Sequence, residues 1–195
     1  MTYKVIGATK SRTFRVMWAL EEMGMPYDHI PAAPRSDEAK TYNPSGKVPA
    51  LVDGDDILTD SMAILTYLAD KHGKLTALAG TPARARQDAI TFWLIDEFDA
   101  ILWAAAKHSF VLPEDKRMPA VKDVLKEEFS ASAVQLTERL DGPFLAGDAL
   151  TVPDILACHC LNWAVGAGFP RVDDKLFNYA KALRQRPAFQ AAAAR

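Results

Sequence analysis

Residues 43–61 read NPSGKVPALVDGDDILTDS, and this short stretch carries the strongest structural signals of the chain. Asp53-Gly54 separates two apolar runs, and glycine accepts the positive φ that tight hairpin turns require. The pattern therefore predicts a β-hairpin with strands near residues 50–53 and 56–59.

Pro49 opens the first of these strands, although proline has no N–H to give to a sheet. Two interpretations are open. A trans Val48-Pro49 bond would simply start an edge strand, and trans is the commoner state of X-Pro bonds. A cis bond would turn the chain sharply and leave the backbone N–H and C=O of Val48 available to pair with a peptide-like ligand, as an added strand.

Asp60 and Ser61 stand at the start of a helix predicted for residues 61–72, which Gly73 ends. Both residues are good helix caps. A helix N-terminus with a hydroxyl and free N–H groups is also an anion site. A ligand with a carboxylate could therefore bind at Ser61 while its backbone pairs with Val48.

Elsewhere the pattern of the chain changes near residue 75. Before this point, strand and helix signals alternate, with strands predicted at 3–6 and 27–31, a helix at 14–23, and a short polar helix or loop at 36–42. After it, strand signals vanish, and helices are predicted at 83–110, 121–140, from 152 onward, 173–184 and 187–194. The motif Thr151-Val-Pro-Asp154 has the spacing of a capping box. The sequence thus predicts an α+β domain of order βαβ-ββα in residues 1–75, followed by an all-α domain in residues 82–195.

The composition excludes several classes of partner. Across 195 residues the net charge is −2 and the pI is near 6.1, so no electrostatic footprint for nucleic acid or an anionic membrane is present. No run of 18 or more apolar residues predicts a membrane span, and the N-terminus is too polar for a signal peptide. Cys158 and Cys160 are interpreted as buried thiols in a reducing compartment, with the cytoplasm as the expected location. These cysteines and His159 supply too few ligands for a metal site, so no metal is expected.

The stretch NPSGKVPALVDGDDILTDSMAILTYL resembles the glutathione-binding signature of soluble, bacterial-type members of the glutathione S-transferase family. SRTFRVMWALEEMGMPY resembles the first helix of that family and its lead into the second strand. LTVPDI resembles the capping element of its C-terminal helical domain. The resemblance implies a thioredoxin-like N-terminal domain, a helical C-terminal domain and a homodimer.

The same resemblance assigns glutathione as a co-substrate and gives roles to five residues around the hairpin. Val48 would pair with the cysteinyl backbone of glutathione, and Pro49 would be cis. Ser61 would take the γ-glutamyl carboxylate, and Asp60 would help with its ammonium group. Lys47 is a candidate partner for the glycyl carboxylate, with a solvated loop lysine as the alternative.

A transferase of this kind must form a thiolate, because the thiol is a poor nucleophile. The loop at residues 7–13 offers hydroxyls at Thr9, Ser11 and Thr13, of which Ser11 is favoured and Thr9 is second. Arg12 and the helix N-terminus add positive potential. The alternative for Ser11 or Thr13 is a helix cap. No cysteine lies in this loop, so mixed-disulfide chemistry is not supported.

The electrophile is expected to bind between the domains. Candidates from the far half of the long helix are Trp103, Lys107, His108 and Phe110, with core packing as the alternative for each aromatic residue. We expect conjugation of glutathione to a small hydrophobic electrophile, as in detoxification, or a related glutathione-dependent reduction or isomerisation. The other hypothesis is a non-catalytic binding or dimerisation module of the same family. The joint presence of Lys47 to Pro49 with Asp60-Ser61 favours glutathione binding.

Overall fold

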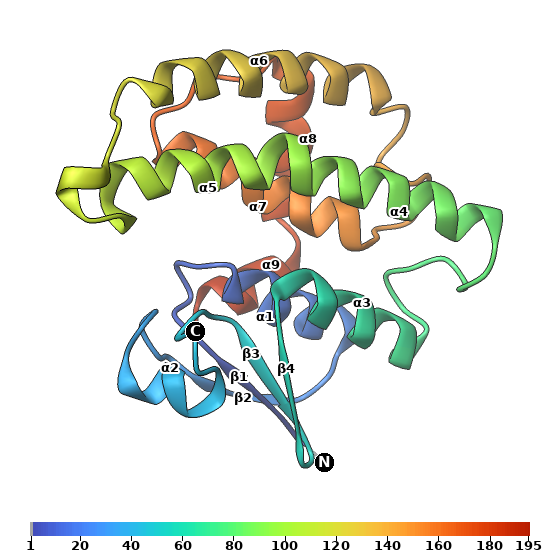
Figure 1. Cartoon of the computed structure of the whole chain (residues 1–195). Helices are drawn as coiled ribbons and strands as arrows, with labels where there is room; N and C mark the ends of the chain where they lie inside the picture. The colour runs from blue at the N-terminus through green and yellow to red at the C-terminus, as the bar shows by residue number, and fades with distance from the viewer. Residues whose placement is uncertain (1) are drawn as a thin grey trace. The chain divides into compact units, whose positions relative to one another are not determined.

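The computed structural model describes residues 2–195, which divide into two compact units (Figure 1). The N-terminal unit contains the chain up to Thr81 together with Arg184–Arg195, and the helical unit contains Pro82–Leu183. Each unit has its own core, and each is described separately below.

The N-terminal unit is built on a four-stranded sheet of order β2-β1-β3-β4. Its strands are β1 (Tyr3–Ile6), β2 (Tyr27–Ile30), β3 (Ala50–Asp53) and β4 (Asp56–Thr59). β1 and β2 are parallel, whereas β3 runs antiparallel to both β1 and β4. The hairpin predicted from Asp53-Gly54 is confirmed, and Ala50 pairs with Thr59 at its open end.

Helices cover both faces of this sheet: α1 (Thr13–Met23) and α3 (Ser61–His72) on one side, and α2 (Asp37–Tyr42) on the other (Figure 1). Because side chains alternate along a strand, neighbouring residues serve different layers. Val5 and Leu51 pair across β1 and β3 and are completely buried. Ile6 and Ala50, one residue along, pack with Ala39 of α2.

The last helix, α9 (Pro187–Ala193), packs against α1 within the N-terminal unit. The Phe189 ring makes edge contacts with Phe14 and Trp18, at centroid distances of 4.8 and 5.0 Å. Arg186 forms a two-pronged ion pair with Glu22, with N···O distances of 2.6 and 2.8 Å. Residues 184–195 thus belong to the first unit by their contacts with the apolar face of α1, whereas the sequence predicts them in the domain of residues 82–195.

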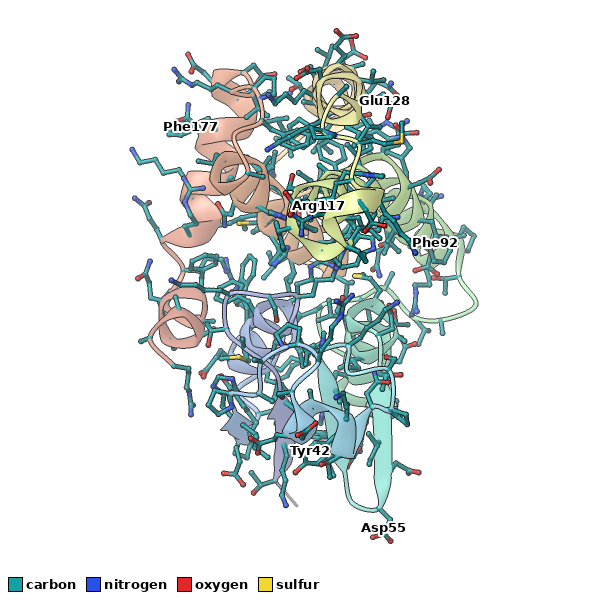
Figure 2. The ribbon with its side chains drawn as sticks, turned by 60° about the vertical axis from the view of Figure 1, so that its left-hand side comes forward. Tyr42, Asp55, Phe92, Arg117, Glu128 and Phe177 are labelled. Carbon is teal, nitrogen blue, oxygen red and sulfur yellow. The ribbon has the colours of Figure 1, made fainter. Side chains whose placement is uncertain are left out.

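The helical unit begins with one long helical rod, in which two π-helical stretches interrupt α-helix (Figure 1). Its parts are α4 (Pro82–Leu94), η1 (Ile95–Ala100), α5 (Ile101–Ala106) and η2 (Lys107–Val111), followed by the 3-10 turn η3 (Glu114–Lys116) and by α6 (Val121–Arg139), α7 (Val152–Gly166) and α8 (Asp174–Arg184). The core is aromatic: the Phe129 ring lies 5.2 Å from Phe98 and 5.2 Å from Phe169, centroid to centroid. Phe92 and Phe177 instead extend from its surface (Figure 2).

The capping box predicted at the start of α7 is confirmed, and its Asp154 also bonds groups outside this helix. The Asp154 carboxylate is completely buried and accepts the N–H groups of Leu145 and Thr151, both at 2.8 Å. It also accepts the Tyr179 hydroxyl of α8 at 2.7 Å. Burial raises the pKa of Asp154, while these donors act in the opposite direction.

Gly7, at the end of β1, is the point at which the first loop meets the cis Val48-Pro49 turn. Its φ is +138°, a backbone conformation that residues with a side chain rarely adopt. A Cβ built at Gly7 would lie 2.1 Å from Thr13 Oγ1 and 2.8 Å from Val48 Cβ. Only glycine therefore lets Thr13 and Val48 approach β1 this closely.

Replacing Asp154 with alanine should lower the free energy of unfolding by about 2–4 kcal/mol, because buried donors would lose their acceptor. Tyr179→Phe is the matched control, since it removes one donor and leaves the carboxylate; about 1 kcal/mol is expected. Urea unfolding of both variants measures the difference. Equal losses in the two variants would contradict the shared-acceptor role of Asp154.

Gly7→Ala should cost about 2 kcal/mol or more in urea unfolding, because strain at positive φ adds to a steric clash. Gly24→Ala provides the control: Gly24 has φ of +68° but no heavy atom within 4 Å of a built Cβ. That variant should cost only the conformational strain, about 1 kcal/mol. If both variants are equally stable, the close approach at Gly7 does not limit the fold.

Candidate functional site

Val48 presents its backbone at the open end of the β3–β4 hairpin. The Val48-Pro49 peptide bond is cis, and Pro49 is buried. Within residues 2–195, the N–H and C=O of Val48 make no hydrogen bond to another group of the protein. An extended peptide can therefore pair with this residue as an added strand.

Ser61 lies at the same end of the hairpin, because β4 ends at Thr59, opposite Ala50. It is the first residue of α3 and is 3% exposed. Asp60 precedes it with φ of +70°, and its Oδ1 accepts the N–H groups of Met62 and Ala63 at 2.9 and 3.1 Å. Asp60 thus caps α3, and the Ser61 hydroxyl stands at the positive end of the helix.

The loop between β1 and α1 holds the three predicted hydroxyls in different settings. The half-buried Ser11 Oγ lies 2.6 Å from the Ala8 carbonyl oxygen and 2.9 Å from Thr13 Oγ1, and it accepts the Thr13 N–H at 3.1 Å. Thr13 is completely buried behind it. Thr9 donates its hydroxyl to the backbone oxygen of Arg195, at 3.2 Å. Ser11 therefore has both the exposure to reach a ligand and a second hydroxyl in contact with it.

The start of α1 is electropositive. Arg12 occupies the N-cap position and is half-buried, and the first turn of the helix has no acidic residue. The partial positive charge of the helix N-terminus adds to that of the guanidinium. An anion, including a thiolate, is favoured at this end of the helix.

Two residues that the sequence reasoning missed support this region. The guanidinium of Arg15, on α1, lies 3.2 Å from Ser61 Oγ and is 1% exposed. The His29 ring, on β2, bonds the carbonyl oxygen of Gly7 through Nε2 at 2.8 Å. Neither residue belongs to the quoted hairpin motif, although Arg15 lies in the segment that resembles the family's first helix.

Lys47 precedes Val48 and has an exposed side chain. Its backbone is fixed: the Lys47 carbonyl accepts the Asn43 side-chain amide at 3.0 Å, and its N–H reaches Ser45 Oγ at 3.3 Å. The ammonium group can therefore sample a range of positions on one side of the Val48 turn.

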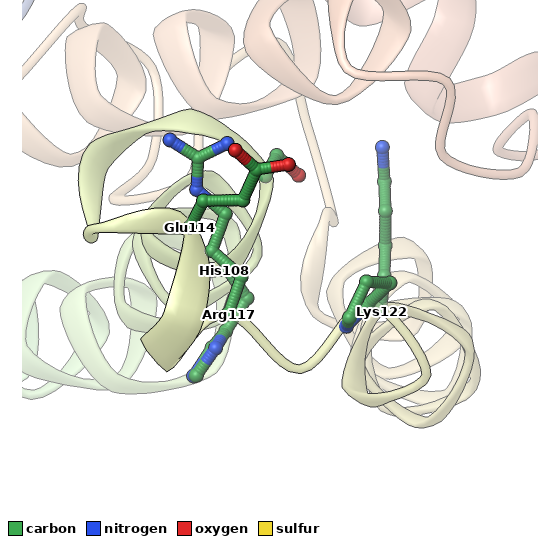
Figure 3. A pocket seen from close by; sticks show the side chains of 6 residues that line it. His108, Glu114, Arg117 and Lys122 are labelled. Carbon is green, nitrogen blue, oxygen red and sulfur yellow. The ribbon is translucent and has the colours of Figure 1, made fainter.

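The four residues predicted for the electrophile lie along one part of the helical unit. Trp103 is half-buried on α5, whereas Lys107, His108 and Phe110 lie on η2, with Phe110 68% exposed. His108 lines a surface pocket of about 290 Å³, together with Ser109, Glu114, Arg117, Pro119 and Lys122. Figure 3 shows Lys122 entering this pocket from α6, opposite His108 and Arg117. The other three predicted residues do not line it.

The described part of the chain, residues 2–195, contains no group of three or more His, Cys, Asp or Glu side chains arranged for a metal. None of its helices is long and apolar enough to cross a bilayer.

Comparison with known proteins was made on both sequence and structure. Residues 11–71 match the family model described as "Glutathione S-transferase, N-terminal domain". A zeta-class glutathione S-transferase of Euphorbia esula is 30% identical over 190 residues, which cover 92% of this chain and 81% of the relative.

Two solved structures share the whole fold. Glutathione S-transferase-I, bound with lactoylglutathione, aligns at a TM-score of 0.78 and 26% identity, over 100% of this chain and 99% of its own. A theta-class glutathione S-transferase of Xanthomonas axonopodis pv. citri, with glutathione bound, aligns at 0.80 and 24% identity, over 98% and 96%. With the fold, the Val48 turn and the relatives in agreement, the chain belongs to the glutathione S-transferase family.

Proposed function

We propose that this protein is a glutathione transferase that activates the thiol of glutathione and conjugates it to a small hydrophobic electrophile. One observation carries the proposal: a backbone edge at Val48, a hydroxyl at a helix N-terminus and a half-buried hydroxyl at Ser11 gather around Gly7 and α1. A tripeptide with a carboxylate at one end and a thiol in the middle fits these three groups.

Glutathione would be held along its length by the hairpin end. The N–H and C=O of Val48 pair with the cysteinyl residue, and Ser61 donates its hydroxyl to the γ-glutamyl carboxylate. Lys47 approaches the glycyl carboxylate as a flexible cation. Asp60 serves as the cap of α3, and its second carboxylate oxygen is assigned to the γ-glutamyl ammonium group.

Ser11 would act on the sulfur by donating its hydroxyl hydrogen to the thiolate. To do so it must give up donation to the Ala8 carbonyl oxygen, and Thr13 can then donate to Ser11 Oγ in turn. The thiol loses its proton to solvent, and Arg12 and the α1 N-terminus favour the anion. The sulfur then bonds to the electrophilic carbon, as a π bond of that carbon opens and takes a proton from solvent or as its bond to a leaving anion breaks. Thr9 and Ser11 each donate to a backbone oxygen, and we keep Thr9 as the second candidate because the contact with Thr13 Oγ1 belongs to Ser11.

The remaining assignments follow from the family. We assign a homodimer, a role in detoxification and a cytoplasmic location, the last supported by Cys158 and Cys160, which are buried and form no disulfide. Trp103, Lys107, His108 and Phe110 stay predictions for the electrophile site. A glutathione-dependent reduction or isomerisation would use the same thiolate, and a non-catalytic module would bind glutathione without ionising it.

The deciding experiment is a calorimetric titration of the protein with reduced glutathione, with thiolate absorbance read in the same samples. Binding with a thiolate signal at neutral pH is the expected result. Binding without ionisation would favour the non-catalytic module, and absence of binding would overturn the proposal.

Ser61→Ala should weaken glutathione binding by about 1.5–3 kcal/mol, the range of a hydrogen bond to a charged group. Calorimetry measures the change. Ser130→Ala, in the helical unit, is the matched control and should bind as the wild type does. Unchanged affinity in the Ser61 variant would refute the position given to the γ-glutamyl group.

Ser11→Ala should raise the pKa of bound glutathione by about 1–2 units, because the thiolate loses a charge-assisted hydrogen bond. The thiolate absorbance of the complex, followed against pH, measures this shift, and the rate of conjugation at neutral pH should fall with it. Thr9→Ala is the comparison, and in this variant the pKa of bound glutathione should equal that in the wild type. A larger rise of this pKa in the Thr9 variant than in the Ser11 variant would assign the catalytic role to Thr9.

A further inference from the structure

The surface pocket of the helical unit is lined only by residues that take no part in the proposed binding of glutathione. Its walls come from η2, η3, the loop after η3 and the first turn of α6 (Figure 3). The volume of about 290 Å³ equals that of about ten water molecules, at about 30 Å³ each. Pockets for small molecules span about 300–1,000 Å³. The pocket therefore suits a ligand at the small end of that range.

Hydrogen bonds fix the shape of the segment between η2 and α6. Arg117 donates its Nε–H to the Leu112 carbonyl oxygen at 2.8 Å, and its Nη2 lies 3.3 Å from the Phe110 carbonyl oxygen. The Met118 N–H donates to Nδ1 of His108 at 3.1 Å. These bonds join the two ends of the segment. The pocket is thus formed without a ligand, and binding requires little further ordering of the chain.

Three side chains bring N–H groups to this pocket. Because Nδ1 of His108 accepts the Met118 N–H, the hydrogen of the neutral ring is on Nε2. Arg117 has five N–H groups, and its two bonds to carbonyl oxygens leave others for a ligand. Lys122 is half-buried, and its ammonium group makes no hydrogen bond or ion pair with residues 2–195. A group with several acceptor oxygens fits these donors.

The charge around the pocket is positive, although the chain as a whole is acidic. Residues 107–122 contain four lysines and arginines but only two acidic residues, whereas the net charge of the chain is −2. Glu114 is the one acid that lines the pocket; it is exposed, and within residues 2–195 it forms no ion pair with Arg117 or Lys122. The charges of both cations therefore stay available to an anion, which would gain charge-assisted hydrogen bonds from each.

We propose that this pocket binds the phosphate group of a small phosphate monoester. Such a group carries a charge of about −1.5 to −2 at neutral pH and three terminal oxygens. Two cations and the Nε2–H of His108 match this charge and this number of oxygens. A carboxylate has a single charge and two oxygens, so it would leave donors unpaired. The aliphatic stems of Arg117 and Lys122 and the ring of Pro119 offer apolar surface to the organic part of the ester.

Calorimetric titration of the intact chain with phenyl phosphate tests this assignment. Lys122→Gln removes one pocket cation and should weaken binding about tenfold or more, the loss expected for one charge-assisted hydrogen bond. Lys116→Gln is the matched control, because Lys116 is an exposed cation of the same segment that does not line the pocket. Its affinity for phenyl phosphate should stay within about twofold of the wild type.

Glu114→Gln gives a second test with the opposite sign. Loss of the pocket's carboxylate removes a repulsion on the phosphate, so the affinity for phenyl phosphate should rise about threefold. Asp115→Asn is the control, since Asp115 is exposed beside Glu114 and does not line the pocket. This change should have a smaller effect. Both carboxylates lie at the surface, so neither variant exposes the core.

Three further probes define the class of ligand. Benzoate places a carboxylate on the same ring and should bind at least about tenfold more weakly than phenyl phosphate, because it forms fewer charge-assisted bonds. Inorganic phosphate lacks the apolar part and should also bind more weakly. Phenol, which has no charge, should not bind.

Several outcomes would overturn the assignment. One is the absence of saturable binding of phenyl phosphate, and another is a Lys122→Gln effect no larger than that of Lys116→Gln. Equal affinity for benzoate would refute the preference for phosphate, and equal affinity for inorganic phosphate would refute the preference for an ester. None of these measurements involves glutathione, so their failure would leave the proposed transferase function as it stands.

Discussion

The close approach at Gly7 is the constraint on which the site depends. Three segments meet where β1 ends: the first loop, the first turn of α1 and the cis turn at Val48. A side chain at Gly7 would occupy the space that Thr13 and Val48 now share. Glycine at this position loses conformational freedom on folding, but its lack of a side chain lets a loop hydroxyl, a strand edge and a helix N-terminus lie close enough to act on one ligand.

The features that could be predicted from the sequence are those with local causes. The turn after Asp53 specifies the hairpin and its register, because Gly54 supplies the positive φ and a two-residue turn makes Asp53 pair with Asp56. The capping box at Thr151 likewise specifies where α7 begins. The cis bond before Pro49 required the family resemblance, since the residues alone allowed both isomers.

What the sequence did not reveal depends on tertiary contacts. Arg15 looks like a polar position on the surface of an amphipathic helix, and nothing in the spacing of α1 says that α3 covers it. The alanine-rich end of the chain has helical periodicity but no signal for its partner, so the packing of α9 against α1 was not predicted. The preference for Ser11 over Thr9 came from the sequence and stays a prediction, to which the structure adds the contact between Ser11 Oγ and Thr13 Oγ1.

The return of α9 to the N-terminal unit has a consequence for synthesis on the ribosome. Domains usually fold in the order in which they emerge, the first one before the second is complete. Here the surface of α1 around Phe14 and Trp18 is covered by Phe189, which emerges only after the entire helical unit. This apolar surface of the first unit therefore stays exposed until the last helix has been synthesised. Exposed apolar surface of this kind favours aggregation in an incomplete chain, and a chaperone bound there would protect it.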